Sequence, residues 1–398
     1  MDLPGLLAEI PGRTEAEHVF RHRDVRRPPG TGADGAAGGE PGRHRPGPRD
    51  LHALRARGGS AEVRRPPGRP VVDVHSHFFP DRFLRALMRE GAAHGARVEE
   101  RGGERLVWSS PHQVAKIGPV FYDVPARLQA MDRWGIGLQA LSLSPPMLYW
   151  APPALGRDLA RTFNEELEAI CRAHPDRFVA LATLPLQDVD GAVAEVARAA
   201  RAGCRGVYVG TNVNGRYLDA VEFAPLYDAA ARLRLPVFTH PLNNAGEDRM
   251  DRWHLGNSVG NPGETALAAA RLIMSGTLDR HPRLAVVLAH GGGSLPFIAA
   301  RMDHAYEVRR ECREAIAERP SSYLRRLYFD TITHGDAALA LLIRTAGPGR
   351  VLLGTDHPYD MADPAPVRRL RRTGLSSTAV EAISRRNARR LLRLDGAA

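Results

Sequence analysis

Residues 71–80 read Val-Val-Asp-Val-His-Ser-His-Phe-Phe-Pro, and this stretch decides how the rest of the chain is interpreted. Its first residues are mostly β-prone and apolar, which predicts a buried strand. Positions i and i+2 of a strand point to the same face, so His75 and His77 would present two imidazoles together. Two imidazoles make half of a typical zinc coordination sphere. Alone, the pair could equally be structural, and the other ligands must come from elsewhere in the chain.

The composition is that of an ordinary globular protein of 398 residues, 43% hydrophobic and 25% charged, which is enough for one large α/β domain. The net charge of +10 comes from scattered arginines, with Lys116 as the only lysine, so we expect no nucleic-acid partner. We find neither a signal peptide nor an apolar run long enough for a membrane span, and expect no membrane association. Three widely spaced cysteines, Cys171, Cys204 and Cys312, argue against a disulfide framework and predict a cytoplasmic enzyme.

Residues 1–69 differ from the rest because they are rich in Gly, Pro and Arg. Such a composition cannot bury enough apolar surface to form a core, so we predict a disordered leader followed by a folded domain over residues 70–398. An upstream start codon, or a basic arm that binds a partner, would be alternative explanations of this segment.

From residue 71 onward, short apolar runs alternate with longer helical stretches, which predicts repeated βα units. Strands are expected at 71–77, 138–144, 178–184, 206–210, 236–240, 284–290, 327–331 and 351–356. Helices are expected at 125–135, 157–174, 191–202, 223–233, 264–280, 295–318, 336–346 and 378–394. Eight such pairs predict an α/β fold of the (β/α)8 TIM barrel type. The insertion after the first strand, residues 78–124, is too long for a simple loop, and its alternating residues 105–108 predict a small hairpin cap.

Metal-competent side chains end four of the predicted strands. His75 and His77 end the first strand, His240 the fifth, His290 the sixth and Asp356 the eighth. In barrels of this kind the carboxyl ends of the strands carry the catalytic groups around one axis. Each residue could separately serve a structural hydrogen bond, but their joint placement predicts one metal site.

The motifs at these strand ends resemble the amidohydrolase superfamily (amidohydrolase-related family 2), and within it the subgroup similar to aminocarboxymuconate semialdehyde decarboxylase. The resemblance covers residues 71–394 and rests on V-H-S-H at 74–77, V-F-T-H-P at 237–241, A-H-G-G-G-S-L-P-F at 289–297 and L-G-T-D-H-P at 353–358. It implies that His75, His77, His240 and Asp356 bind one divalent metal together with a water, with zinc expected and manganese as the alternative. It also implies that His290 is the acid and base beside that water.

The chemistry of these residue types agrees with this assignment. Three neutral imidazoles and one carboxylate leave a positive charge on Zn²⁺, which lowers the pKa of a bound water toward about 7. The reference pKa of a histidine, about 6.5, suits His290 for proton exchange at neutral pH. Binuclear members of the superfamily usually carry a carboxylated lysine at the fourth strand, where residues 207–212 read V-Y-V-G-T-N. We therefore expect one metal.

Substrate recognition follows the resemblance less closely. The resemblance implies that Arg301 reaches a substrate carboxylate in the neighbouring subunit's site, and hence a homodimer. The family's other carboxylate-binding arginine is missing, and the corresponding residues 114–122 offer Lys116 instead. Trp253 and Phe297 are expected to line the substrate pocket, although each could instead serve packing.

We therefore predict a carboxy-lyase: a metal-dependent, nonoxidative decarboxylase of a small carboxylated aromatic or dienoic acid. A proton from the metal-bound water would pass through His290 to the carbon that loses CO₂. The alternative is a metal-dependent hydrolase of a lactone, ester or amide, or a hydratase, because the same hydroxide could attack a carbonyl. A binding protein built on an inactive barrel is disfavoured, since all five rim residues are present.

Overall fold

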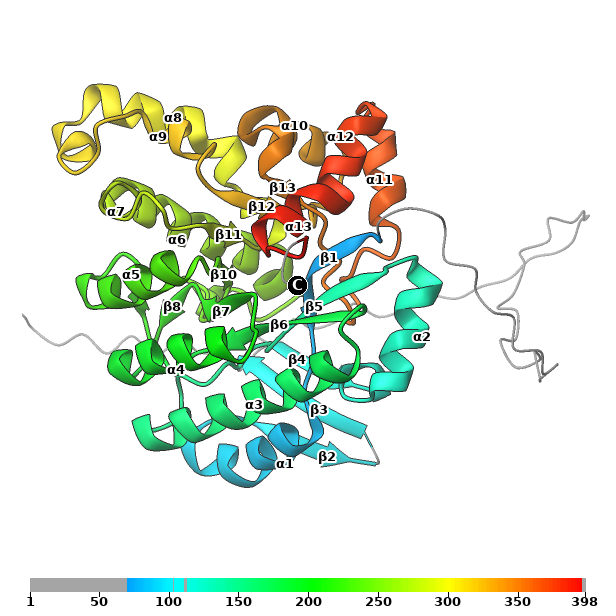
Figure 1. Ribbon diagram of the computed structural model, residues 1–398. Helices are drawn as coiled ribbons and strands as arrows, with labels where there is room; N and C mark the ends of the chain where they lie inside the picture. Colours follow the sequence, from blue (N-terminus) through cyan, green and yellow to red (C-terminus); the bar gives the residue numbers. More distant parts are fainter. Residues whose placement is uncertain (1–69, 103, 111–112, 396–398) are drawn as a thin grey trace, which may run out of the picture. The chain divides into compact units, whose positions relative to one another are not determined.

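The computed structural model describes residues 70–102, 104–110 and 113–395, so the predicted leader over residues 1–69 lies outside the described residues. Eight parallel strands form one sheet in the order β1-β5-β6-β7-β10-β11-β12-β13, and the helices lie around these strands (Figure 1). The sheet closes because β1 also pairs with the segment that follows β13. The predicted (β/α)8 barrel is confirmed.

The strands of the barrel are β1 (Val72–His77), β5 (Leu138–Ser142), β6 (Phe178–Thr183), β7 (Gly206–Gly210), β10 (Val237–His240), β11 (Val286–Leu288), β12 (Tyr328–Asp330) and β13 (Val351–Leu352). The helices are α1 (Asp81–Glu90), α2 (Val124–Trp134), α3 (Pro153–Ala173), α4 (Val189–Arg201), α5 (Ala224–Leu233), α6 (Asn261–Met274), α7 (Thr277–Arg280), α8 (Leu295–Val308), α9 (Pro320–Tyr323), α10 (Asp336–Ala346), α11 (Pro366–Arg372), α12 (Ser377–Glu381) and α13 (Asn387–Leu391). A small hairpin, β8 (Asn212–Val213) with β9 (Arg216–Tyr217), follows β7.

Local sequence explains where several helices begin and end. The side chain of Asp123 accepts a hydrogen bond from the backbone N–H of Ala126 at the start of α2, and Asp188 does the same for Gly191 at the start of α4. Gly135 ends α2 with a φ of 70°, a left-handed conformation that costs glycine little. These caps fix the ends of helices that pack their apolar faces against the barrel.

Several predicted elements end earlier than expected, and three of them are explained by the local backbone. The helix predicted over 295–318 ends at Val308, because Arg309 is extended and the residues after it are mostly charged until the buried Ile316. The helix predicted over 264–280 breaks at Gly276, which has a φ of 72°. The strand predicted over 351–356 ends at Leu352, and the last predicted residue, Asp356, has a left-handed φ of 63° that is incompatible with a strand.

The insertion after β1 is larger than the predicted hairpin. It consists of α1 and an antiparallel three-stranded sheet of β2 (Val98–Arg101), β3 (Glu104–Ser110) and β4 (Gln113–Ile117). The alternating residues 105–108 lie in β3, as the period-2 pattern predicted, and Val107 turns to the buried side. A hairpin has two strands, whereas this sheet has three. The sequence did not predict β4 because only its last residue, Ile117, is buried.

A buried network of polar side chains hydrogen-bonds to the first strand, β1. The Arg127 guanidinium is fully buried and donates to the carbonyl oxygens of His77 and Val120 and to the side chain of Gln139. Gln139 in turn donates to Asp73, 2.8 Å away. Burial lowers the pKa of Arg127 to about 9, against the opposing effect of Asp73. The network fixes the backbone on both sides of the His-Ser-His motif.

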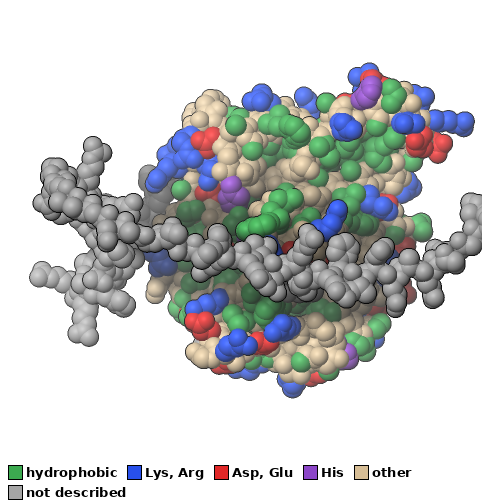
Figure 2. All heavy atoms as spheres, turned by 180° about the vertical axis from the view of Figure 1, so that it is seen from behind, with side chains coloured by type: hydrophobic (Ala, Val, Ile, Leu, Met, Phe, Trp, Pro, Cys, Tyr) green, Lys and Arg blue, Asp and Glu red, His purple; other side chains and the backbone are tan. Residues whose placement is uncertain are grey.

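The surface and the helices bear on the charge distribution and on membrane crossing. On the face drawn in Figure 2, lysine and arginine side chains are scattered among acidic and hydrophobic ones and form no single basic area. Among the described residues, no helix combines the length and the apolar character that crossing a membrane would need. The three cysteines are free thiols.

Replacing Arg127 by methionine should destabilise the fold. The change leaves three acceptors, two of them backbone carbonyls, without their donor, and each buried unpaired acceptor costs about 1–3 kcal/mol. We expect the free energy of unfolding to fall by roughly 3 kcal/mol or more, measured by urea unfolding followed by circular dichroism. The matched control is Arg133→Ala, an exposed arginine on the same helix, which should change stability little. Equal stability of the two variants would contradict this role of the network.

Candidate active site

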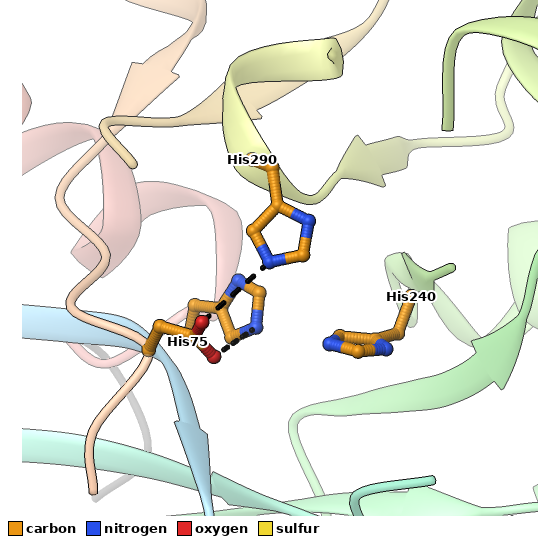
Figure 3. Close-up of side chains that lie close together, drawn as sticks. His75, His240 and His290 are labelled. Carbon is orange, nitrogen blue, oxygen red and sulfur yellow. Dashed lines mark ion pairs between the residues drawn. The ribbon is translucent and has the colours of Figure 1, made fainter. Parts of the chain in front are cut away.

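Five predicted residues meet at the carboxyl ends of the barrel strands. His75 and His77 come from β1, His240 is the last residue of β10, His290 follows β11 and Asp356 follows β13. All except the half-buried His290 are buried. The rings of His75, His240 and His290 point toward one common space (Figure 3). The structure therefore brings together residues that are up to 281 positions apart in the sequence.

The ligand-competent atoms in this cluster are closely spaced. Single nitrogen or oxygen atoms of His75, His240, His290 and Asp356 all lie within 4.8 Å of one another. The Nε2 atom of His77 lies 3.2 Å from Nε2 of His75 and 3.1 Å from Oδ1 of Asp356. His290 Nε2 is 3.7 Å from Asp356 Oδ2. A single divalent ion could contact several of these atoms at once.

Hydrogen bonds behind the cluster orient two of the imidazoles. His75 Nδ1 lies 2.7 Å from Asp330 Oδ2, and His240 Nδ1 lies 3.0 Å from the carbonyl oxygen of Pro241. Both partners are acceptors, so each Nδ1 carries the proton and each Nε2 offers a lone pair to the cluster. The Nδ1 atoms of His77 and His290 are buried without a partner. The donor set thus fits a cation best at His75 and His240.

Electrostatics around the cluster also suit a cation. Burial lowers the pKa of His240 well below its usual value and that of His77 to about 4, so both rings are neutral at pH 7. Burial alone would raise the pKa of Asp356, but hydrogen bonds with His290 and His77 hold it well below its usual range. For His75, the opposing effect of burial is outweighed by the hydrogen bond to Asp330 and nearby carboxylates, which raise its pKa. The cluster therefore offers two neutral imidazoles and an ionised carboxylate, a donor set that a divalent ion can bind.

His290 faces the cavity above the cluster. Its side chain is 12% exposed, whereas that of His77 is fully buried. His240, His290 and Asp356 line a cavity of about 350 Å³, a size suited to a small organic molecule. Residues of the insertion form another part of the same wall: Val107, Gln113, Val114, Ala115, Lys116 and Phe121.

The four predicted substrate residues are placed differently. Lys116 lines the cavity and is ion-paired with Glu104 on the neighbouring strand. Trp253 and Phe297 are 83% and 79% exposed and lie outside the residues that line the cavity. Arg301 is exposed on α8. Within one chain, the structure therefore brings Lys116 to the cavity and leaves the other three on the surface.

One residue of the site was missed by sequence reasoning. Asp330 ends β12, is 1% exposed and contacts His75 directly. A carboxylate at the end of the seventh strand, in Tyr328-Phe329-Asp330, occupies the rim position that singled out the other strand ends, and this signal could have found it.

The chain is similar to known proteins both in sequence and in structure. A family model described as amidohydrolase matches residues 72–394. A 2-amino-3-carboxymuconate-6-semialdehyde decarboxylase from Dictyostelium discoideum is 34% identical over 299 residues, which cover 74% of this chain and 83% of that protein.

Two solved structures share the fold over nearly their whole length. A 5-carboxyvanillate decarboxylase from Sphingomonas paucimobilis superposes with a TM-score of 0.71 and 26% identity, covering 82% of this chain and 99% of that one. A dihydroxybenzoic acid decarboxylase from Polaromonas sp. JS666, with bound manganese and the inhibitor 2-nitroresorcinol, gives a TM-score of 0.69 and 25% identity, with coverages of 83% and 98%.

Removal of a clustered imidazole should remove bound metal. We expect purified wild-type protein to carry about one divalent ion per chain, and His240→Ala to lose more than tenfold in metal affinity, because even residues behind a metal ligand contribute 10–100-fold. Metal content after dialysis, measured by inductively coupled plasma mass spectrometry, checks this. His94→Ala, an exposed histidine outside the cavity lining, is the control and should retain the ion. A wild-type protein with no more metal than His240→Ala would contradict the assignment.

Proposed function

This chain belongs to the amidohydrolase family, and we propose that it is a metal-dependent, nonoxidative decarboxylase of a small carboxylated aromatic or dienoic acid. The observation that carries the proposal is the cluster itself. Imidazoles and one carboxylate converge at a cavity whose wall includes His240, His290 and Asp356. The relatives that decarboxylate aromatic or muconate acids support the choice of substrate class.

The metal ligands in this proposal are His75, His77, His240 and Asp356. When bound, a divalent ion supplies a Lewis acid that anchors an oxygen of the substrate beside the reacting carbon. Zn²⁺ suits three imidazoles and a carboxylate, and the manganese in the Polaromonas structure supports Mn²⁺ as the alternative. Imidazole binds a metal in its neutral form, so Asp356 would contribute the single negative charge among the four ligands.

His290 is the proton donor of the proposed reaction. Of the four histidines in the cluster, it is the one that is half-buried rather than buried, and it lines the cavity. Its proton is transferred to the ring or diene carbon that bears the carboxylate, and the bond between that carbon and the carboxylate then breaks. The electron pair of this bond stays with the carbon skeleton as CO₂ leaves. Neither an oxidant nor a reductant is consumed.

The insertion and a second subunit would complete substrate binding. Lys116 is the one cavity residue of β4 with a positive charge, and we assign it to a second carboxylate or acidic hydroxyl of the substrate. Phe297 and Arg301 stand four residues apart on α8 and so share one face of that helix. That face, with the exposed Trp253, is assigned to a homodimer interface, through which Arg301 would reach the partner's cavity.

Replacing His290 by glutamine should abolish most of the activity while leaving the metal in place. Loss of a general acid typically costs 10²–10⁴-fold in rate. Wild-type protein loaded with Zn²⁺ or Mn²⁺ should release CO₂ from at least one member of a panel of hydroxylated benzoates and carboxylated dienoates, and His290→Gln should lower kcat at least 100-fold with unchanged metal content. Hydrolysis of lactones or esters by the same preparation, without CO₂ release from any acid, would exclude the proposed reaction.

Charges placed on the proposed interface should separate the subunits. In the double variant Trp253→Glu/Phe297→Glu, two desolvated carboxylates would oppose dimer formation. We expect sedimentation velocity to show a dimer for wild type and a monomer for this variant. The control, Val221→Glu, changes a residue that is 81% exposed elsewhere on the surface and should leave the dimer intact. A wild-type monomer at micromolar concentration would overturn the dimer and the role of Arg301 together.

A further inference from the structure

The carboxylate of Asp330 contacts both halves of the proposed active site. Oδ2 accepts from Nδ1 of His75 at 2.7 Å and from the backbone N–H of His290 at 2.9 Å. Oδ1 accepts from the backbone N–H of Gly291 at 2.8 Å and of Ile332 at 2.9 Å. Four donors from three separate segments of the chain therefore meet on one carboxylate that is 1% exposed.

The first of these contacts determines which nitrogen of His75 faces the cluster as an acceptor. A carboxylate can only accept, so Nδ1 of His75 must carry the proton and Nε2 must offer its lone pair. Without Asp330 the ring could hold its proton on either nitrogen, and the tautomer with a protonated Nε2 cannot bind a metal.

The next two contacts hold the turn that carries His290. Residues 290–293 all have positive φ, with His290 at 53°, a conformation that non-glycine residues seldom adopt. The N–H groups of His290 and Gly291 both point to Asp330, which stabilises this turn and directs the His290 ring toward the cluster.

The neighbouring backbone is shaped to allow this approach. A Cβ atom on Gly354 would come within 2.9 Å of the Cβ of Asp330 and 3.0 Å of the Cβ of His75. Glycine in the Leu-Gly-Thr-Asp motif thus leaves the room that the contact between Asp330 and His75 requires.

We propose that Asp330 is a positioning residue that acts on the metal ligand His75 through its ring and on the proton donor His290 through its backbone. The inference rests on the proposed function in that both use the same metal centre. It adds that one buried carboxylate couples metal affinity to the placement of the proton donor, so a single substitution should impair both.

An amide cannot replace this carboxylate. In Asp330→Asn, one of the two acceptor oxygens becomes an NH₂ group. If this group takes the place of Oδ2, it opposes the N–H of His290 and drives the proton of His75 to Nε2. If it takes the place of Oδ1, it opposes the N–H groups of Gly291 and Ile332. Both orientations leave donors unpaired, and the first also removes a metal ligand.

Asp330→Asn tests the proposal in two measurements. Competition between the protein and a chromogenic chelator for Zn²⁺ should show affinity reduced about 10–100-fold. With Zn²⁺ raised to saturation, kcat for CO₂ release should still be at least tenfold below wild type, with a smaller change in KM, because the His290 turn has lost its acceptor. Affinity within twofold of wild type would overturn the role toward His75, and a wild-type kcat at saturating Zn²⁺ would overturn the role toward His290.

A matched variant separates positioning from general loss of stability. Glu195 is another buried carboxylate with several donors, from Arg198, Asn164 and Arg161, and it lies on α4 away from the cluster. Glu195→Gln should destabilise the fold yet keep wild-type affinity for Zn²⁺; an equal loss of affinity would overturn the specific role of Asp330. If Asp330→Asn does not fold, Asp330→Glu, whose carboxylate is displaced by one methylene, carries the same test.

The affinity measurement needs no substrate, so the two claims can fail separately. If Asp330→Asn binds Zn²⁺ more weakly but wild-type protein releases CO₂ from no acid, the proposed decarboxylase activity is contradicted. The positioning role of Asp330 toward His75 then still holds. If wild type releases CO₂ but Asp330→Asn binds Zn²⁺ as tightly as wild type, the decarboxylase activity holds and the positioning role toward His75 is contradicted.

Discussion

The site depends on the closure of the barrel between its first and last strands. The N–H of Val74 donates to the carbonyl of Leu353 at 2.9 Å, and the N–H of Asp356 donates to the carbonyl of His75 at 2.9 Å. These bonds place the carboxylate of Asp356 directly beside the two imidazoles of β1. Without them, residues from the first and last strands of the barrel would have no reason to meet, and the cluster would lack its only negative ligand in the proposed set.

Buried carboxylates then fix the geometry that closure creates. Asp73 accepts from the N–H of His75 and from both the N–H and the hydroxyl of Thr355, so it joins β1 to the loop that carries Asp356. Burial raises the pKa of Asp73 to about 6, in opposition to these hydrogen bonds, which favour the ionised form. Asp330 holds the same residue by its side chain, because it accepts a hydrogen bond from Nδ1 of His75. In the proposed site, His75 and the loop of Asp356 are therefore held by hydrogen bonds without a cation, which would reduce the reorganisation that metal binding requires.

The sequence was sufficient for the fold and for the residues that meet at the rim. Apolar runs that end in His or Asp are a local signal, and the barrel converts that signal into a shared location. The resemblance to the amidohydrolase superfamily and the class of carboxy-lyase are confirmed, since the relatives and the solved neighbours are decarboxylases. What stayed hidden depends on contacts between distant segments. The end of the seventh strand marks Asp330 as a rim carboxylate, but only the structure shows its four donors. Arg127 reads in the sequence as an ordinary helix arginine, and only the structure shows that it is buried.

The most direct test of the account follows the carbon that loses its carboxylate. The metal-loaded protein would be given a carboxyl-¹³C-labelled acid in D₂O, and gas and product would be measured by mass spectrometry and ¹H NMR. The account predicts ¹³CO₂ and a product with one deuterium at the carbon that bore the carboxylate, because a deuteron from the solvent replaces the carboxylate. A product that keeps the labelled carboxylate, with a hydrolysed or hydrated bond elsewhere, would contradict decarboxylation at this site.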